Sequence, residues 1–422
     1  MQNKGEKTAP VLRFKGFSDD WEQRKLGDIV ERVTRRNKEL KTTLPLTISA
    51  QEGLIDQNDF FDRTIASRDV SNYYLVMNGD FAYNKSYSNG YPWGAVKRLE
   101  RYDMGVLSTL YIVFKPTDVN SDFLAKYYDT NRWYQEVSKH AAEGARNHGL
   151  LNISASDFFE TELIIPSDKV EQTKIASLII RFDNLITLHQ RKLDLLKCMK
   201  QGFLQQIFPE QGVKIPRLRF ADFNEAWEQR KLFDNINKVI DFRGRTPKKI
   251  GLDWSAEGYL ALSALNVKNG YIDTTVDAHF GNQELYDKWM EGNALQKGQV
   301  LFTTEAPMGN VAQVPDDEGY ILSQRTISFD LKPEMMIDGF LAILLRSPNV
   351  YKELVSFSSG GTAKGVSQKS LMELSAIVPK NIEEQKATYL LISQINNLVT
   401  FHHHKVEFLS SLKKLFLQEI FI

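Results

Sequence analysis

The 422-residue chain carries 53 Lys and Arg against 53 Asp and Glu, so its formal net charge is zero and global charge gives no argument for a nucleic-acid partner. Its hydrophobic content of 42% is ordinary for a globular protein, and the length suffices for two or three domains. The single cysteine, Cys198, excludes a disulfide framework within the chain. No run of about 18 apolar residues occurs and the first residues do not resemble a signal peptide, so we expect a cytoplasmic protein without membrane contact.

The first distinctive stretch is residues 10–26, which read PVLRFKGFSDDWEQRKL. Residues 216–232 repeat it as PRLRFADFNEAWEQRKL, at a shift of 206. The string WEQRKL is identical in both copies, and its Trp and Leu predict a short helix anchored in the domain by these two buried side chains. Nothing in the string indicates chemistry, so we interpret it as a docking element.

Each docking element is followed by a globular stretch, residues 27–165 and 233–378. Short β-type runs such as Leu44–Ser49 and Leu110–Phe114 lie between Gly- and Asn-rich turns, which predicts a mixed fold. The second stretch is far more divergent but keeps the plan of the first, at a shift of about 217. The two stretches therefore share a scaffold and differ in their surface loops.

A long helix is predicted to close each half. Residues 166–209 contain no internal proline, and their apolar side chains recur at alternating steps of four and three from Ile175 to Ile207, the seam of a coiled coil. Residues 379–422 align with this stretch without a gap at a shift of 213. Even the polar interruption at Lys200 returns, as Lys413.

Two repeats related by a two-fold axis across a rod run in opposite directions, so we predict that the two helices pair antiparallel. If their ends overlap fully, paired residue numbers sum to about 591. That register would place Phe182 on Leu409 and Lys413 near Ile179.

These patterns predict an α/β (α+β) chain with a pseudo-two-fold internal repeat. The expected parts are a first globular domain at 1–165, a first long helix at 166–209, a second globular domain at 210–378 and a second long helix at 379–422. Nearly copied helices between divergent globular domains indicate one fixed task for the helices. The globular domains would then carry two different recognition tasks of one kind.

Catalytic and cofactor motifs give no positive signal. Gly144–Gly149 and Gly360–Gly365 have a glycine spacing like that of a P-loop, but neither is followed by Lys-Ser/Thr, so the ligands for a nucleotide phosphate and Mg²⁺ are missing. The run His402–His404 does not predict a metal site, because consecutive helical residues point about 100° apart and helical ligand pairs need i, i+4 spacing. We expect no catalysis by this chain, no metal and no cofactor.

Polar and basic side chains in the globular loops are more informative, because these side chains grip phosphates and read base edges. The run from Arg243 to Lys249 places four positive charges in one loop, and crowded like charges favour an anionic partner. An ordinary solvated loop is the alternative for each residue. The candidate DNA contacts are Asn84, Lys85, Ser86, Arg146, Asn147, His148, Arg243, Arg245, Lys248, Lys249, Arg325 and Lys364.

Several further segments occur in a distinctive order: residues 79–96 (GDFAYNKSYSNGYPWGAV), 244–251 (GRTPKKIG), 297–315 (KGQVLFTTEAPMGNVAQVP) and 321–329 (ILSQRTISF). Together with the repeated openings and the long helices headed by Glu-Gln, they make the chain resemble the specificity (S) subunits of type I restriction–modification systems over nearly its whole length. Each segment is a weak signal alone, whereas their order is specific.

The resemblance implies two α/β target recognition domains, each reading one half of a bipartite double-stranded DNA site. It implies that the helices form an antiparallel spacer on which two modification (methyltransferase) subunits dock, and that restriction subunits join this complex. A different interpretation is a coiled-coil scaffold holding two protein-binding modules, which predicts no salt-dependent DNA affinity. A third is a self-contained nucleic-acid enzyme, which predicts methyl transfer or cleavage by the chain alone.

Overall fold

The computed structural model describes residues 9–62, 66–67, 69–86, 90–141, 151–210, 212–276, 278–358 and 365–421. The chain divides into two compact units. The first comprises Met1–His189 and His404–Ile422, and the second comprises Gln190–His403. Both boundaries fall inside long helices, so each long helix contributes residues to both units.

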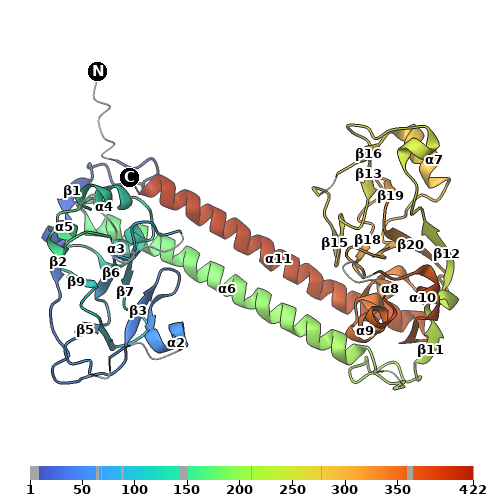
Figure 1. The fold of residues 1–422 in the computed structure, drawn as a ribbon, viewed down its shortest axis with the longest axis horizontal. Helices are drawn as coiled ribbons and strands as arrows, with labels where there is room; N and C mark the ends of the chain where they lie inside the picture. The colour runs from blue at the N-terminus through green and yellow to red at the C-terminus, as the bar shows by residue number, and fades with distance from the viewer. Residues whose placement is uncertain are drawn as a thin grey trace. The chain divides into compact units, whose positions relative to one another are not determined.

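The two long helices are α6 (Lys169–Ile207) and α11 (Ile382–Ile420), each of 39 residues, which confirms the two helices predicted from the repeat (Figure 1). Both begin directly after a side chain that caps the first turn. The Asp168 carboxylate accepts from the Val170 N–H at 2.7 Å, and the Asn381 side chain accepts from the Glu383 N–H at 2.8 Å. Acidic residues in both first turns also suit the positive end of the helix dipole.

The first unit is built from short strands with helices packed beside them. Its elements before α6 are β1 (Glu22–Lys25), α1 (Leu26–Ile29), β2 (Val30–Arg32), β3 (Leu46–Ser49), β4 (Gly53–Asp56), α2 (Gln57–Phe61), β5 (Tyr74–Met77), β6 (Phe81–Asn84), β7 (Ala95–Arg98), β8 (Met104–Leu107), β9 (Ile112–Pro116), α3 (Ser121–Tyr128), α4 (Tyr134–His140), α5 (Ala155–Phe159) and β10 (Glu162–Ile165). The main sheet has the order β2-β9-β6-β7, with every neighbouring pair antiparallel. Its core is aromatic: Phe81 stacks on Phe114 at 5.4 Å and Tyr83 stacks on Phe158 at 4.4 Å between ring centroids.

The second unit repeats this plan and adds strands of its own. Its elements besides the long helices are β11 (Glu228–Lys231), the 3-10 helix η2 (Leu232–Asn235), β12 (Ile236–Asp241), the 3-10 helix η3 (Pro247–Ile250), β13 (Tyr259–Leu262), β14 (Val267–Lys268), β15 (Tyr271–Ile272), β16 (Phe280–Gly281), α7 (Gln283–Met290), β17 (Val300–Thr303), β18 (Val311–Gln313), β19 (Tyr320–Leu322), β20 (Thr326–Leu331), α8 (Asp338–Leu345), α9 (Pro348–Phe357), α10 (Gln368–Glu373) and β21 (Ser375–Val378). The main sheet has the order β12-β20-β17-β18, the counterpart of β2-β9-β6-β7. This mixture of strands and helices confirms the α/β class.

The docking element differs from its prediction. Trp21, Leu26, Trp227 and Leu232 are buried as expected. However, the residues between Trp and Leu form strands, and a short helix begins only at the Leu, as α1 and η2. β1 pairs antiparallel with β10, and β11 pairs with β21. The strand that enters each domain thus pairs with the strand that leads into its long helix. Because this partner is far away in sequence, the short string could not reveal it.

A buried ion pair explains two other repeated motifs. Arg13 of the first opening donates to both carboxylate oxygens of Glu171, at 2.7 and 2.8 Å, and Arg219 does the same to Glu384 at 2.7 and 2.9 Å. Both glutamates are about 1% exposed. The Arg-Phe of each opening and the Glu-Gln of each long helix are therefore two halves of one contact, which fastens the start of the helix to its domain.

In the first unit the start of α6 lies beside the end of α11, running antiparallel, but the predicted register is wrong there. Phe182 packs on Phe416, with ring centroids 5.3 Å apart, and not on Leu409. Lys413 pairs with Asp183 at 2.6 Å, four residues beyond Ile179. The physical reason lies at the end of the chain: Phe421 is buried in the aromatic core of the domain, so α11 ends farther from the start of α6 than equal overlap would place it.

None of the helices in the described ranges is both long enough and apolar enough to span a membrane.

Candidate nucleic-acid interface

In the second unit, three chain segments meet at one end of the main sheet. β12 ends where Asp241 pairs with Ile327 at the start of β20, and β17 ends where Thr303 pairs with Thr326. Since β20 is antiparallel to both neighbours, the residues that follow β12 and β17 and the residue that precedes β20 lie at the same sheet end. Two of the predicted DNA contacts, Arg243 and Arg325, are placed here.

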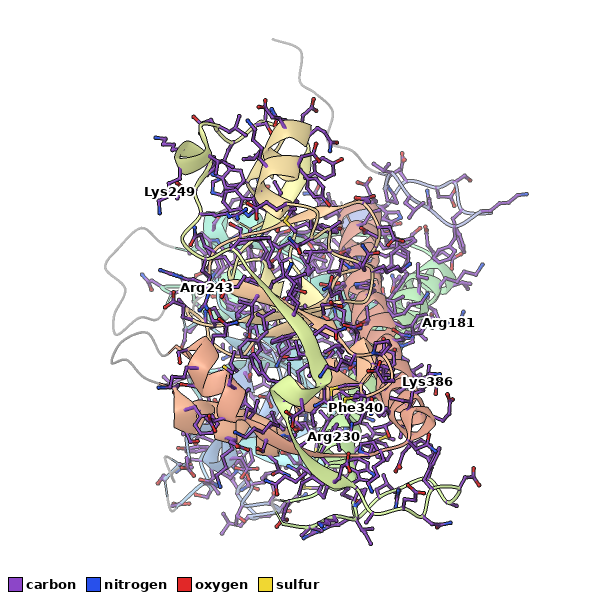
Figure 2. The ribbon with its side chains drawn as sticks, turned by 90° about the vertical axis from the view of Figure 1, so that its right-hand side faces the viewer. Arg181, Arg230, Arg243, Lys249, Phe340 and Lys386 are labelled. Carbon is purple, nitrogen blue, oxygen red and sulfur yellow. The ribbon has the colours of Figure 1, made fainter. Side chains whose placement is uncertain are left out.

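Arg243 is held at this sheet end by Asp241. Its Nε lies 2.9 Å from both carboxylate oxygens, and its Nη1 lies 3.4 Å from the Thr304 hydroxyl oxygen. The hydrogen bond that Arg243 donates to Asp241 raises the pKa of Arg243 above its ordinary value. The guanidinium is thus permanently charged and fixed in direction, with part of its surface open to solvent (Figure 2).

Arg325 occupies a strained backbone position directly before β20. Its φ of 62° lies in the left-handed region, which residues other than glycine seldom adopt. Its carbonyl accepts from the Thr304 N–H at 2.8 Å, and its Nε lies 3.2 Å from a Glu305 carboxylate oxygen. With its side chain 54% exposed, it is the most open of the arginines in this cluster. We name Arg243, Thr304, Glu305 and Arg325 the second sheet-end cluster.

Arg245 has a mainly structural environment. Its guanidinium lies 4.5 Å from the centre of the Phe242 ring, donates to the Trp289 carbonyl and pairs with Glu291 at 2.8 Å. These contacts tie the loop to the end of α7. The role of Arg245 as a DNA contact stays a prediction, with few of its donors left for a ligand.

Lys248 and Lys249 lie on η3, where the sequence predicted an irregular loop. The Thr246 side chain caps this short turn, and Pro247 occupies its first position. Lys249 donates to the Gly244 carbonyl at 2.7 Å, and both lysines are exposed. Lys248 also borders a cavity of about 340 Å³ whose wall includes Trp254. Both ammonium groups are accessible to an anionic ligand.

The first unit has a corresponding sheet end at the end of β6. Asn84 is the last residue of β6, and its side-chain oxygen accepts from the Ser86 N–H at 2.9 Å. The half-buried Lys85 donates to the Ile153 carbonyl at 3.1 Å. We name Asn84, Lys85 and Ser86 the first sheet-end cluster.

One backbone hydrogen bond shows that the two clusters occupy equivalent places. In the first unit the Leu151 N–H donates to the Lys85 carbonyl at 3.0 Å, and in the second the Val366 N–H donates to the Thr304 carbonyl at 2.9 Å. Leu151 comes shortly before α5, β10 and α6, and Val366 comes shortly before α10, β21 and α11, which are the same three kinds of element in the same order. The remaining candidates, Arg146, Asn147, His148 and Lys364, lie outside the described residues.

Sequence reasoning missed two members of the second cluster and one arginine at the corresponding position of the first unit. Thr304 and Glu305 were not selected because the search favoured positive charge. Arg36, which follows β2 as Arg243 follows β12, lies 4.8 Å from the centre of the Tyr74 ring. A strand-by-strand alignment of the two halves would have found it.

A metal site is not assigned. His403, His404 and Glu407 of α11 each offer one potential ligand atom, and these atoms lie within 4.8 Å of one another. All three are exposed, and exposed groups of this kind commonly occur without an ion.

Comparison with known proteins agrees with this geometry. Residues 224–409 match the model of the type I restriction modification DNA specificity domain. The chain is 24% identical over 319 residues to the type I restriction enzyme MjaVIII specificity subunit of Methanocaldococcus jannaschii, covering 74% of this chain and 72% of that protein. It is 23% identical over 417 residues to the putative type I restriction enzyme MjaX specificity subunit of the same organism, covering 94% and 91%.

A solved structure shows the same fold over the whole chain. The type I restriction–modification system S subunit from M. genitalium superposes with a TM-score of 0.58 at 12% identity, covering 98% of this chain and 99% of that one. The repeated fold of this chain is thus the fold of that S subunit. Over most of its length the chain is thus similar to type I restriction–modification specificity subunits, in agreement with the resemblance seen in the sequence.

Proposed function

We propose that this chain is the DNA-specificity subunit of a type I restriction–modification complex. Each globular domain reads one half of a bipartite double-stranded site, and the chain supplies recognition while partner subunits supply catalysis. The observation that carries the proposal is the repeated sheet end. The same backbone hydrogen bond supports a different set of side chains in each unit, as two readers of different half-sites require.

The chemistry of the clusters suits contact with DNA. Arginine can donate two parallel hydrogen bonds to guanine in the major groove, and serine or asparagine can read other base edges. Lys248 and Lys249 suit phosphate contacts that position the domain without reading sequence. Glu305 would then keep the Arg325 guanidinium oriented until Arg325 binds a base.

We further propose that two modification subunits dock on the long helices, that restriction subunits join this complex, and that it works in the cytoplasm. The alternative function is a coiled-coil scaffold holding two protein-binding modules. It is disfavoured by the match of residues 224–409 to a DNA specificity domain. Salt-dependent DNA binding separates the two, because a scaffold would show none.

The test is to sequence the methylated motif in cells that carry the complete system with single substitutions in this chain. Arg325→Ala should relax base preference in one half of the site only, at a cost of about 1–3 kcal/mol against the wild-type half-site. Ser86→Ala, the matched change in the first unit, should affect only the other half. If both substitutions leave both half-sites unchanged, the sheet ends do not read DNA.

A further inference from the structure

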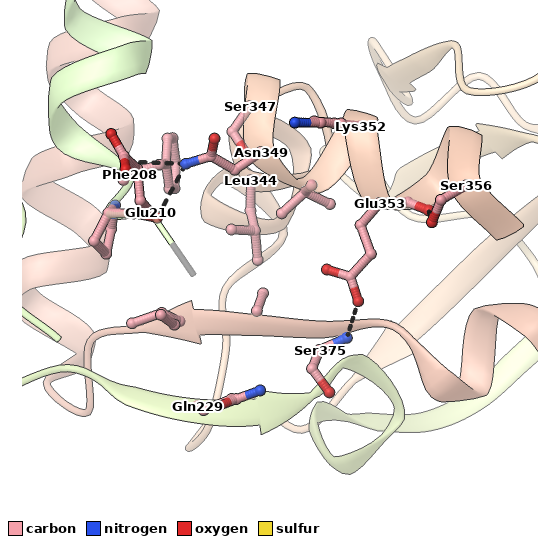
Figure 3. Close-up of a pocket in the computed structure, with 14 residues that line it drawn as sticks. Phe208, Glu210, Gln229, Leu344, Ser347, Asn349, Lys352, Glu353, Ser356 and Ser375 are labelled. Carbon is pink, nitrogen blue, oxygen red and sulfur yellow. Dashed lines mark hydrogen bonds between the residues drawn. The ribbon is translucent and has the colours of Figure 1, made fainter. Parts of the chain in front are cut away.

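The second unit contains a pocket of about 500 Å³ between the residues that follow α6, helix α9 and strand β21 (Figure 3). Its wall includes Phe208 and Pro209, five residues of α9 and the β21 residues from Ser375 to Ile377. The pocket lies entirely within the second unit and shares no residue with the second sheet-end cluster. Its wall is partly apolar and partly polar.

Ser347 supplies a polar atom to this wall. Its side chain is fully buried, and its hydroxyl oxygen has no hydrogen-bond partner in the described part of the chain. The residue stands at the position that caps α9, but its side chain does not cap the helix. A buried hydroxyl without a partner costs on the order of 1–3 kcal/mol, so a bound polar group would stabilise it.

Asn349 and Glu353 add polar groups to the same pocket. The Asn349 amide nitrogen donates to the carbonyls of Phe208 and Pro209, at 3.5 and 3.0 Å (Figure 3). Glu353 accepts only a long bond of 3.5 Å from the Ser375 N–H. No lysine or arginine of the described residues forms an ion pair with Glu353.

The first unit carries different side chains at the corresponding positions. At the shift of 217, Glu353 corresponds to Glu136. The Glu136 carboxylate also accepts a hydrogen bond from the first residue of the last strand of its domain, the Glu162 N–H, at 3.4 Å. Glu136, however, pairs with Lys139, and the position of Lys139 is Ser356 in the second unit. The buried ring of Trp133 is replaced by Val350, a residue of the pocket wall. The second unit thus lacks the cation and the ring, and keeps the carboxylate.

We propose that this pocket binds an arginine side chain of a protein partner. A guanidinium carries five donors in a fixed fork and matches a carboxylate flanked by neutral oxygen acceptors. It would take, in trans, the place that Lys139 takes within the first unit. Only the identity of the partner rests on the proposed function, since that function places the chain in a complex with other subunits.

Among the charged side chains around the pocket, Glu353 is the one that would attract a cation. Glu210 at the rim already pairs with Arg217 at 3.3 Å. Lys352 also lines the pocket, but its side chain is exposed and forms no ion pair with Glu353 among the described residues. A cation entering the pocket would therefore meet the Glu353 carboxylate, which no described cation pairs.

The experiment uses N-acetyl-arginine amide as the probe and the full-length chain as the target. Methyl groups of Leu344, Val350 and Ile377 line the pocket and report binding by NMR. We expect saturable shifts of these methyl signals, with a dissociation constant in the millimolar range that is usual for one small side chain. N-acetyl-citrulline amide, which has the same shape without the charge, should produce no saturable shift.

Two variants and one control assign the binding to Glu353. Glu353→Gln keeps an acceptor for the Ser375 N–H, and it should weaken binding of the probe about fivefold or more. Ser356→Lys places a lysine where the first unit has Lys139, and it should abolish binding of the probe to the second unit. Lys139→Ser is the control in the first unit. It should leave probe binding unchanged, because Trp133 still occupies the position of Val350 there. No saturable shift in the wild type, equal binding of citrulline, or unchanged binding in folded Glu353→Gln would each overturn the proposal. None of these measurements involves DNA, so their failure is distinct from failure of the proposed function.

Discussion

The two units treat the same helical lysine in opposite ways. In the first unit Lys413 of α11 belongs to an alternating chain of charges. It pairs with Asp183 at 2.6 Å, Asp183 pairs with Lys126 at 2.8 Å, and Asp129 pairs with both Lys126 at 3.5 Å and Lys97 at 2.8 Å. Although burial lowers it, the pKa of Lys126 is raised overall by Asp129 and Asp183. Every cation here has an acidic neighbour.

In the second unit the same positions carry no acid. The repeat places Lys200 at the position of Lys413, Asn396 at that of Asp183, Ile343 at that of Lys126 and Arg346 at that of Asp129. Burial, and then the nearby Arg346, lower the pKa of Lys200 to about 8, and burial also lowers the pKa of Arg346. A copied helix therefore does not bring a copied environment, because the globular domain decides whether the helical charge is compensated.

The largest expected effect concerns the ion pairs that fasten the long helices. Glu384→Ala should destabilise the second unit by about 4 kcal/mol, because it leaves Arg219 unpaired beside a buried site. Glu171→Ala should cost the first unit about 1 kcal/mol less. The reason is that the Trp227 indole also donates to Glu384, at 2.9 Å, whereas the Trp21 indole nitrogen has no partner among the described residues.

Hydrogen exchange measured separately for the amides of each unit gives these two free-energy changes, because two units need not unfold in one step. Arg13→Lys and Arg219→Lys provide milder versions of the same comparison. Equal destabilisation by the two alanine variants would show that the hydrogen bond from Trp227 to Glu384 adds nothing to the stability of the second unit.

How far the sequence predicts this molecule depends on how local the signal is. The long helices were predicted within about three residues of their bounds, because an apolar period and the absence of proline are properties of the segment itself. The docking strands were predicted as helices because their pairing partners, β10 and β21, lie far along the chain. The register was wrong by four to seven residues, which is about one to two helical turns, because burial of Phe421 in the domain core decides it.

The candidate site follows the same rule. Charge composition selected Arg243 and Arg325, which the structure brings to one sheet end, but it did not distinguish them from Arg245. That distinction comes from Phe242 and Glu291, which reach Arg245 through the tertiary fold. Only the structure shows that the clusters of the two halves stand at equivalent sheet ends.

Replacing the helical lysines Lys413 and Lys200 should change stability by a smaller amount, and in opposite directions in the two units. Lys413→Met should destabilise the first unit by about 1 kcal/mol, since Asp183 loses one of two cations and part of the site is open to solvent. Lys200→Met should stabilise the second unit by a similar amount, because it removes a poorly compensated charge and keeps the apolar stem. Thermal unfolding at pH 7 measures both, and equal signs would contradict the comparison.

The pH dependence of the same variants sharpens this test. The pKa of Lys200 is lowered from 10.5 to about 8 in the folded state, so the unfolded chain binds more protons between these values. The cost of charging Lys200 is fully present below pH 8 and disappears as the pH rises toward 10.5. The advantage of Lys200→Met should therefore shrink over this window, and a constant advantage would mean that the charge is not its cause.

The smallest effect concerns the exposed lysines that only the second unit carries on η3. Lys248→Ala with Lys249→Ala should weaken DNA binding of the assembled complex uniformly across sequences, by reducing the number of phosphates neutralised. The slope of log K against log salt should fall by about one for each phosphate that is no longer neutralised, and so by about two for the pair. Arg245→Ala is the matched control: because its guanidinium is engaged by Trp289 and Glu291, it should lower the stability of the second unit and leave the slope nearly unchanged. A slope that stays constant in the double variant would remove η3 from the interface, while the sheet-end clusters would still account for base recognition.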